Sequence, residues 1–183
     1  MKRTLEQALA ALEAQIRTWV SSPARPEIRV FPYPPEWEPV MLGRIGELAG
    51  RLKGEGQHLE VEDVGRGFLA VLEQKAPLVD RLARSEGGSE QQVVHDLGVL
   101  ASRYLEELFR RPLRPDAVCR VVVNTGALAT VLSYSAVLNG LHGARGERGP
   151  GGPTIVALPG EADDRSLNLL GLRKDTNYRT ARI

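Results

Sequence analysis

The sequence has few of the residues that build disulfide-stabilised folds and metal centres. Its 183 residues include one cysteine and three histidines. A single cysteine excludes a disulfide within the chain, and the histidines lack the spacing of a zinc site. We therefore predict no bound metal and no cofactor. A chain of this length buries roughly 70% of its unfolded surface, so a single domain is stable without covalent cross-links.

An excess of one charge and long apolar runs are also missing. Lys and Arg number 24 against 23 Asp and Glu, a formal net charge of +1. Dedicated nucleic-acid binders usually have a clear basic excess, so we expect no strong direct binding of nucleic acid. No apolar run approaches the roughly 20 residues of a membrane span. The first residues lack the apolar core of a signal peptide. We therefore predict a cytoplasmic protein that does not enter membranes.

Several catalytic patterns are absent as well. The residues after Gly126 are Ala-Leu-Ala-Thr, without the lysine of a phosphate-binding loop. Residues 65–67, Gly-Arg-Gly, lack the third glycine of the dinucleotide fingerprint. Cys119 lies inside an apolar run, which predicts a buried and inert thiol. The sequence thus predicts no catalytic residue, and we expect a protein that is not an enzyme.

The most informative stretch of the sequence is residues 117–132. Residues 117–123 are mostly β-branched and apolar, which is typical of a central strand buried on both faces. Asn124, Thr125 and Gly126 end this run, and an apolar helical pattern follows as far as residue 140. A strand, a polar turn and a helix in this order form the βα unit of a parallel sheet.

The rest of the chain alternates in the same way. Further strands are expected at 28–31, 58–64 and 154–158, with helices at 35–52 and 89–108. A helical region begins at 68 and is interrupted at Pro77, and residues 78–84 continue it as a second short helix. The alternation predicts an α/β fold, a three-layer Rossmann-like, doubly wound and mainly parallel sheet of four to five strands flanked by helices. Residues 23–183 are predicted to be one domain, with a flexible Gly-rich loop at 143–153 and a short strand or arm near the C-terminus. The polar–apolar alternation of residues 58–64 indicates a strand near the sheet edge.

Residues 1–22 are predicted to form an amphipathic helix, with a capping box of Thr4 and Gln7 at its start. Its apolar residues recur at spacings of 4, 3, 4 and 3 and form one narrow seam. Such a seam packs on the helix's own domain, or on a partner or a second copy as in a coiled coil. Both alternatives stay open. As interface candidates of a homodimer we take the residues of the seam, Leu5, Leu9, Leu12, Ile16 and Trp19.

The ligand-binding candidates follow from the predicted sheet. The carboxyl ends of parallel strands meet at one end of the sheet, which is the usual binding crevice of this architecture. Thr125 and Gly126 also start a helix, where free N–H groups favour an anion. The same residue types are ordinary in caps and turns, so a purely structural role is the alternative. The candidates at this end are Tyr33, Glu36, Asp63, Asn124, Thr125, Gly126 and Glu161.

Four motifs carry a resemblance to a known family. They are Tyr-Pro-Pro-Glu at 33–36, Asn-Thr-Gly-Ala-Leu at 124–128, Leu-Pro-Gly-Glu at 158–161 followed by Ser-Leu-Asn-Leu-Leu-Gly at 166–171, and the ending Asp-Thr-Asn-Tyr-Arg-Thr-Ala-Arg-Ile. In this order they resemble the BrxB family of the BREX bacterial phage-exclusion systems, from about residue 29 to the C-terminus. The Gly-rich loop is longer than expected for that family, and the first helix has no counterpart.

The resemblance implies an accessory or scaffolding component of an antiviral system. BrxB proteins are encoded with a PglZ-type protein of the alkaline phosphatase superfamily, which is the expected first partner. No catalytic residue is established for the family, so none is carried over. The alternative is a regulatory domain that binds a nucleotide or phosphate at the strand ends. Thr125, Gly126 and Glu161 would be its centre, with Asp63 nearby.

Overall fold

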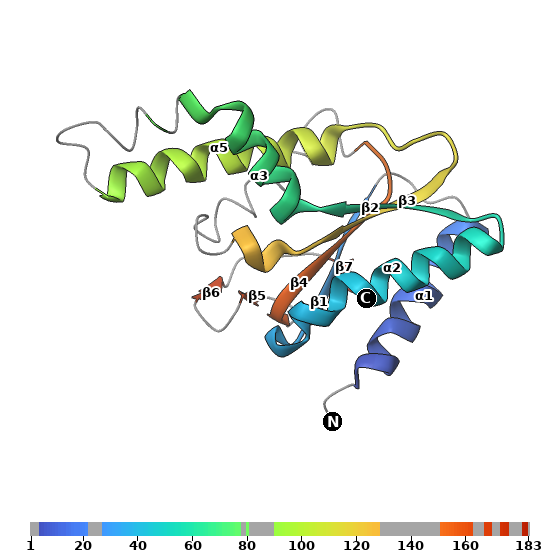
Figure 1. Cartoon of the computed structure of the whole chain (residues 1–183). Helices are drawn as coiled ribbons and strands as arrows, with labels where there is room; N and C mark the ends of the chain where they lie inside the picture. The colour runs from blue at the N-terminus through green and yellow to red at the C-terminus, as the bar shows by residue number, and fades with distance from the viewer. Residues whose placement is uncertain are drawn as a thin grey trace.

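The sheet is the centre of the molecule. The computed structural model describes residues 4–21, 27–77, 80, 90–128, 151–162, 167–169, 173–175 and 181–182. Four parallel strands lie in the order β2-β3-β4-β1 (Figure 1). Their bounds are β1 Ile28–Tyr33, β2 His58–Asp63, β3 Ala117–Val123 and β4 Thr154–Ala162. The predicted α/β fold is confirmed, and so is the position of β2 at a sheet edge.

Helices cover both faces of the sheet (Figure 1). α1 (Leu5–Ser21) and α2 (Glu38–Gly54) pack on one face, and α3 (Val64–Gln74) and α5 (Glu90–Arg110) pack on the other. Two 3₁₀ turns, Pro35–Trp37 and Thr125–Leu128, follow β1 and β3. The arrangement has the three layers that the sequence predicts.

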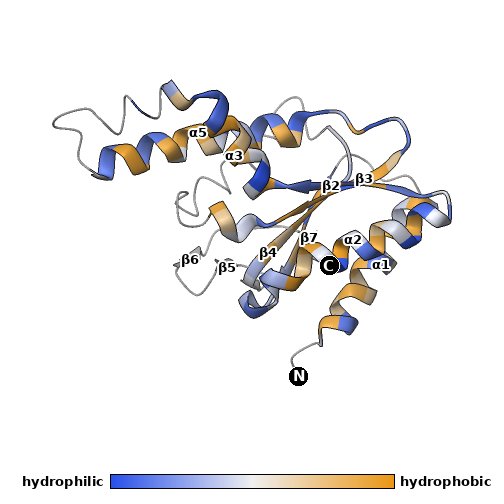
Figure 2. Ribbon diagram, in the orientation of Figure 1, coloured by the Kyte–Doolittle hydropathy of each residue, from blue (hydrophilic) through white to orange (hydrophobic). Residues whose placement is uncertain are grey.

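The side chains of β3 show why the sheet needs both layers. Cys119, Val121 and Val123 point into the core under α1 and α2, whereas Val122 belongs to the core under α3 and α5. Every one of these side chains is fully buried. Figure 2 shows the apolar colouring of β3 and β4, beside helices in which polar and apolar residues alternate. Burial of one such side chain contributes about 1.5–3 kcal/mol.

The seam of α1 lies in the chain's own core, which corrects its interpretation as an interface. Leu12, Ile16 and Trp19 are at most 4% exposed and pack with residues of α2 and the sheet. Leu9 is buried in the same cluster and Leu5 is partly buried against it. The side chains taken as interface candidates are therefore unavailable to a partner while α1 is docked. The other alternative, a helix packed on its own domain, holds.

Polar contacts fix α1 at its start and along its side. Thr4 and Gln7 form the predicted capping box, since each backbone N–H donates to the other's side chain at 3.0 and 3.3 Å. Trp19 donates from its indole N–H to Glu27 at 3.0 Å. The guanidinium of Arg29 lies over the Trp19 ring, 5.5 Å from its centroid. The helix is thus joined to the start of β1 as well as to the sheet.

β4 is longer than the strand predicted at 154–158. β4 continues to Ala162, so residues 159–161 lie within the strand. Pro159 is the last residue that pairs with β1, after which residues 160–162 pair antiparallel with β5 (Leu167–Leu169). β5 pairs with β6 (Arg173–Asp175), and β7 (Ala181–Arg182) pairs in parallel with β1. The chain therefore continues β4 out of the parallel sheet into an antiparallel extension.

Other predictions fall at element boundaries or outside the described ranges. β2 ends at Asp63, one residue earlier than predicted. α3 begins at Val64, four residues before the predicted start of the helix at 68. The helix predicted after residue 128 and the loop at 143–153 lie mostly outside the described residues.

Candidate functional site

The carboxyl ends of the strands bring most of the predicted site residues together. Tyr33 ends β1, Asp63 ends β2, and residues 124–126 follow β3. Two sets of hydrogen bonds link these positions, one through Glu38 at the start of α2 and one through Asp63. The prediction that these residues lie near one end of the sheet is correct.

Glu38 occupies the position where an anion was expected. The backbone N–H of Gly126 donates to one carboxylate oxygen of Glu38 at 3.2 Å. The hydroxyl of Tyr33 donates to the other oxygen. Burial and the neighbouring carboxylate strongly raise the pKa of Tyr33, so the phenol stays protonated and remains a donor. The amide that could bind a phosphate therefore binds the chain's own carboxylate.

Asp63 closes the start of α3. One of its oxygens accepts hydrogen bonds from the Arg66 N–H at 3.0 Å and from the Asn124 side-chain amide at 2.8 Å. Asn124 has a φ of 60°, a left-handed conformation that Asn tolerates better than most residues. A Cβ on Gly65 would lie 2.6 Å from the Asn124 amide nitrogen. The glycine is therefore required for this close approach.

The remaining candidates take structural positions. Thr125 is buried and donates from its hydroxyl to the Ala157 carbonyl at 2.7 Å. Glu36 is exposed on the turn after β1. Glu161 lies in the extension of β4, where its backbone pairs with Asn168. Sequence reasoning missed Glu38. The pattern that could have identified it is an acidic residue in the first turn of a helix that follows a strand.

The thiol and the two described histidines lie apart, at a buried strand, a strand start and an exposed helix face. Cys119 is fully buried, and burial raises the pKa of its thiol to about 12. His58 lies 3.2 Å from Asp116 at the amino ends of β2 and β3. His95 is exposed on α5, and His142 lies outside the described residues. Within the described ranges, no group of three His, Cys, Asp or Glu side chains could hold a metal ion.

A buried ion pair joins β3 to the edge strand β2. Arg120, in the middle of β3, is fully buried, and Glu60 of β2 is 7% exposed. Two nitrogens of the Arg120 guanidinium donate to one Glu60 oxygen at 3.0 and 2.9 Å. The other donations of Arg120 go to the last carbonyls of α5 and the loop after it, those of Leu108, Arg111 and Pro112, at 2.7, 2.9 and 3.3 Å. Arg120 thus caps the C-terminal end of α5.

Glu60 receives donors from several arginines. Arg111 donates to Glu60 at 2.7 Å and also bonds Glu62, while the backbone N–H of Arg114 donates to Glu60 at 3.2 Å. Burial alone would raise the pKa of Glu60. Hydrogen bonds from the three arginines outweigh this effect and lower the pKa to about 2. Sequence reasoning missed the pair because Arg120 stands in an otherwise apolar run.

A groove of about 560 Å³ runs beside this pair. Its lining consists of Leu59, Glu60, Val61 and Glu62 from β2 and of Arg111, Pro112, Leu113 and Arg114 from the loop after α5. Consecutive side chains of a strand point to opposite faces. A cavity lined by four consecutive strand residues therefore runs along the edge of the strand.

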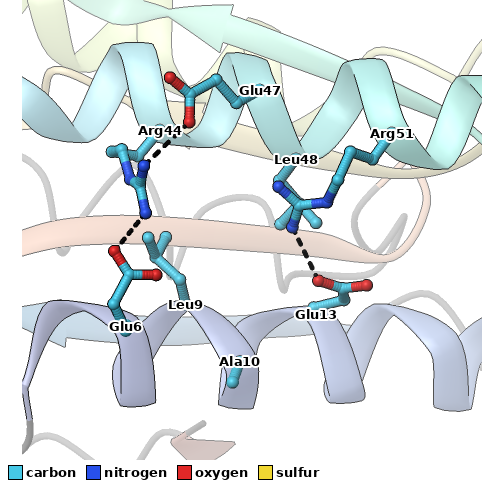
Figure 3. A pocket seen from close by; sticks show the side chains of 8 residues that line it. All are labelled: Glu6, Leu9, Ala10, Glu13, Arg44, Glu47, Leu48 and Arg51. Carbon is cyan, nitrogen blue, oxygen red and sulfur yellow. Dashed lines mark hydrogen bonds and ion pairs between the residues drawn. The ribbon is translucent and has the colours of Figure 1, made fainter.

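A second, smaller groove lies between α1 and α2 (Figure 3). It measures about 160 Å³, and its rim is bridged by the pairs Glu6–Arg44 and Glu13–Arg51, the latter at 2.9 Å. Arg44 also reaches Glu47 at 3.1 Å, so the charges of the rim are largely paired with one another. Exposed pairs of this kind contribute about 0–1 kcal/mol each. The groove is best explained as the seam along which α1 joins α2.

Comparisons with known proteins do not identify a family. No protein-family model, no curated protein and no solved structure matches the chain. The likeness to BrxB proteins therefore rests on the motifs of the sequence. Among the helices of the described residues, none is long and apolar enough to cross a membrane.

Proposed function

We propose that this chain is a non-catalytic scaffolding subunit that acts by binding other proteins. The observation that carries the proposal is the closure of the carboxyl end of the sheet. There the Gly126 amide is held by Glu38, and the start of α3 is held by Asp63. Parallel α/β sheets usually bind small molecules at that end. Internal closure favours a function on another surface of the domain.

The family resemblance supports a more specific proposal. As in BrxB proteins, the chain would be a cytoplasmic accessory component of a BREX phage-exclusion system, with a PglZ-like protein as its partner. Two of the motifs that carry the resemblance, at 33–36 and 124–128, contribute to the closed end. The predicted homodimer loses its original basis because the seam of α1 is buried, and self-association stays a prediction.

The alternative function, binding of a nucleotide or phosphate at the strand ends, has less support. A phosphate at the Gly126 amide would have to displace the Glu38 carboxylate, which already accepts two hydrogen bonds there. Asp63 adds a second carboxylate nearby, on the other side of Asn124. Two acidic side chains disfavour a polyanionic ligand.

The proposal is tested by size-exclusion chromatography with light scattering. The chain would be run alone, with the PglZ-like protein encoded in the same gene cluster, and with the other proteins of that cluster. We expect co-elution with the PglZ-like protein. A chain that co-elutes with none of these proteins contradicts the proposal.

A nucleotide screen by thermal shift distinguishes the alternative, nucleotide-binding function from the scaffolding function. A ligand present at 100 times its dissociation constant adds about 2.7 kcal/mol of stability. We expect no nucleotide to stabilise the chain on that scale. Stabilisation that disappears in a Gly126→Ala variant would favour the alternative, because a Cβ at this position would lie 3.0 Å from Glu38 and obstruct the amide.

A further inference from the structure

The outer side of β2 is an open edge in the part of the chain that the structure describes. β2 pairs with β3 in parallel over residues 58–63, and no strand pairs with it on the other side. The outward-facing N–H and C=O groups of an edge strand can accept a further strand. The groove of about 560 Å³ follows this same side of β2 over four residues.

The charges of the groove are unequally paired. Arg111 bonds both Glu60 and Glu62, and Arg120 bonds Glu60, so these two carboxylates are neutralised within the chain. The side chain of Arg114 is 58% exposed, and the carboxylate nearest to its guanidinium among the described residues is that of Asp116, at 3.8 Å. This distance is beyond a hydrogen bond. Arg114 is therefore the cation of the groove that can receive an external carboxylate.

The remaining lining residues suit an extended segment. Pro112 and Leu113 line the loop side of the groove, next to Arg114. Residues two apart in an extended chain point to the same face. An acidic side chain that meets Arg114 would therefore place an apolar side chain two residues away toward Pro112 and Leu113.

We propose that the outer edge of β2 binds an extended segment of a partner protein by strand addition, with an Asp or Glu of that segment paired to Arg114. Main-chain hydrogen bonds give such a complex its affinity, and side-chain contacts give its specificity. The inference rests on the proposed function and deepens it by naming the surface and the chemistry of the partner. A second copy of this chain fits less well, since antiparallel β2–β2 pairing centred on Val61 would set Glu60 opposite Glu62.

The experiment uses a displayed library of random ten-residue peptides, selected on the full chain. We expect the enriched peptides to share an acidic residue two positions from an apolar one. An Arg114→Glu variant should lower their affinity roughly tenfold and should itself select basic residues. Its melting temperature should match that of the parent, because the side chain is exposed and the backbone N–H that bonds Glu60 is kept. The matched control is Arg103→Glu, which reverses an exposed charge on α5 and should leave peptide affinity unchanged.

Strand addition has its own signature. Methylation of single backbone nitrogens along a selected peptide should weaken binding at alternate positions, roughly three- to tenfold each, because only every second N–H faces β2. Absence of enriched peptides, binding that is insensitive to Arg114, or an effect of methylation without this alternation would overturn the inference.

The two proposals fail in different ways. If the PglZ-like protein binds the chain and Arg114→Glu leaves that binding intact, the scaffolding function stands and the β2 edge is not its surface. If the library yields acidic peptides with the expected alternation but the PglZ-like protein does not bind, the edge is a docking site and its partner is a different protein.

Discussion

The carboxyl end of the sheet and the outer edge of β2 use charged residues for opposite purposes. At the carboxyl end, the carboxylates of Glu38 and Asp63 accept hydrogen bonds from backbone N–H groups that could otherwise bind a ligand. At the edge strand β2, Glu60 is paired with arginines of the chain itself. The groove beside it is lined by the exposed cation of Arg114. The comparison indicates that the usual ligand site of the architecture is closed in this chain. Within the described ranges, no strand pairs with the outer edge of β2, an edge that such folds normally protect.

The largest expected effect is the loss of Arg120, the buried cation of β3 that pairs with Glu60 of β2. Arg120→Leu leaves Glu60 buried and removes the donors to three carbonyls at the end of α5. We expect a loss of about 3–5 kcal/mol in the free energy of unfolding, measured by chemical denaturation. The double variant Arg120→Leu with Glu60→Leu should recover part of this loss, because it also removes the buried carboxylate that has lost its Arg120 donors. A loss below about 1 kcal/mol for the single variant would contradict the role of Arg120.

The second effect is a pH dependence that comes from the same pair. Hydrogen bonds from arginines lower the pKa of Glu60 from its ordinary value of 4.5 to about 2 in the folded chain. A lowered pKa stabilises the fold above the unfolded value, so this contribution is complete above about pH 4.5 and is lost as the pH falls toward 2. The contribution is up to about 3 kcal/mol. Unfolding curves of the parent and of Glu60→Gln between pH 6 and pH 2 should show a steeper decline for the parent, and equal declines would exclude the effect.

The third prediction tests whether side chains fill the space around Gly65 at the carboxyl end of the sheet. A Cβ on Gly65 would lie 2.6 Å from Asn124 and 2.9 Å from the Ala127 Cβ. Gly65→Ala should therefore cost about 1–3 kcal/mol of stability. The matched control is Gly46→Ala, where nothing lies within 4 Å of the added Cβ on the outer side of α2. The control should gain about 0.5–1 kcal/mol, because alanine favours a helix over glycine. Equal effects of the two substitutions would show that the end is open.

The smallest effect concerns the phenol that holds Glu38. Tyr33→Phe removes the hydroxyl that donates to the carboxylate, while the Gly126 N–H remains as a donor. We expect a loss of about 1 kcal/mol. The pKa of Tyr33 is raised, so its phenol stays protonated at high pH while the chain is folded. Absorbance titration of the folded proteins should therefore show one such late-ionising phenol fewer in Tyr33→Phe than in the parent. An unchanged free energy of unfolding would contradict this prediction. It would mean that water in the unfolded state replaces the hydrogen bond to Glu38 at no cost.

The sequence was informative where local patterns determine the structure. The apolar run of β3 and the alternation of β2 predict a buried strand and an edge strand, and both are present. The capping box of Thr4 and Gln7 is present as well. These features depend on neighbours in the chain, so periodicity and cap chemistry are sufficient to predict them.

The unpredicted features depend on residues far apart in the chain. Glu38 reaches Gly126 across 88 positions, and Arg120 reaches Glu60 across 60. Neither contact leaves a local pattern, and Arg120 occurs in a run that otherwise indicates an apolar core. The seam of α1 has the spacing of both a coiled coil and a core helix, so its place was undecided until the sheet beneath it was known.

The most direct test of the account is hydrogen exchange of the chain, alone and in complex with the PglZ-like protein. Two segments are compared, residues 58–63 of β2 and residues 124–128 at the closed end. We predict that complex formation slows exchange at 58–63 and leaves 124–128 unchanged. Slowed exchange at 124–128 with no change at 58–63 would contradict the claim that the chain works through the edge of β2.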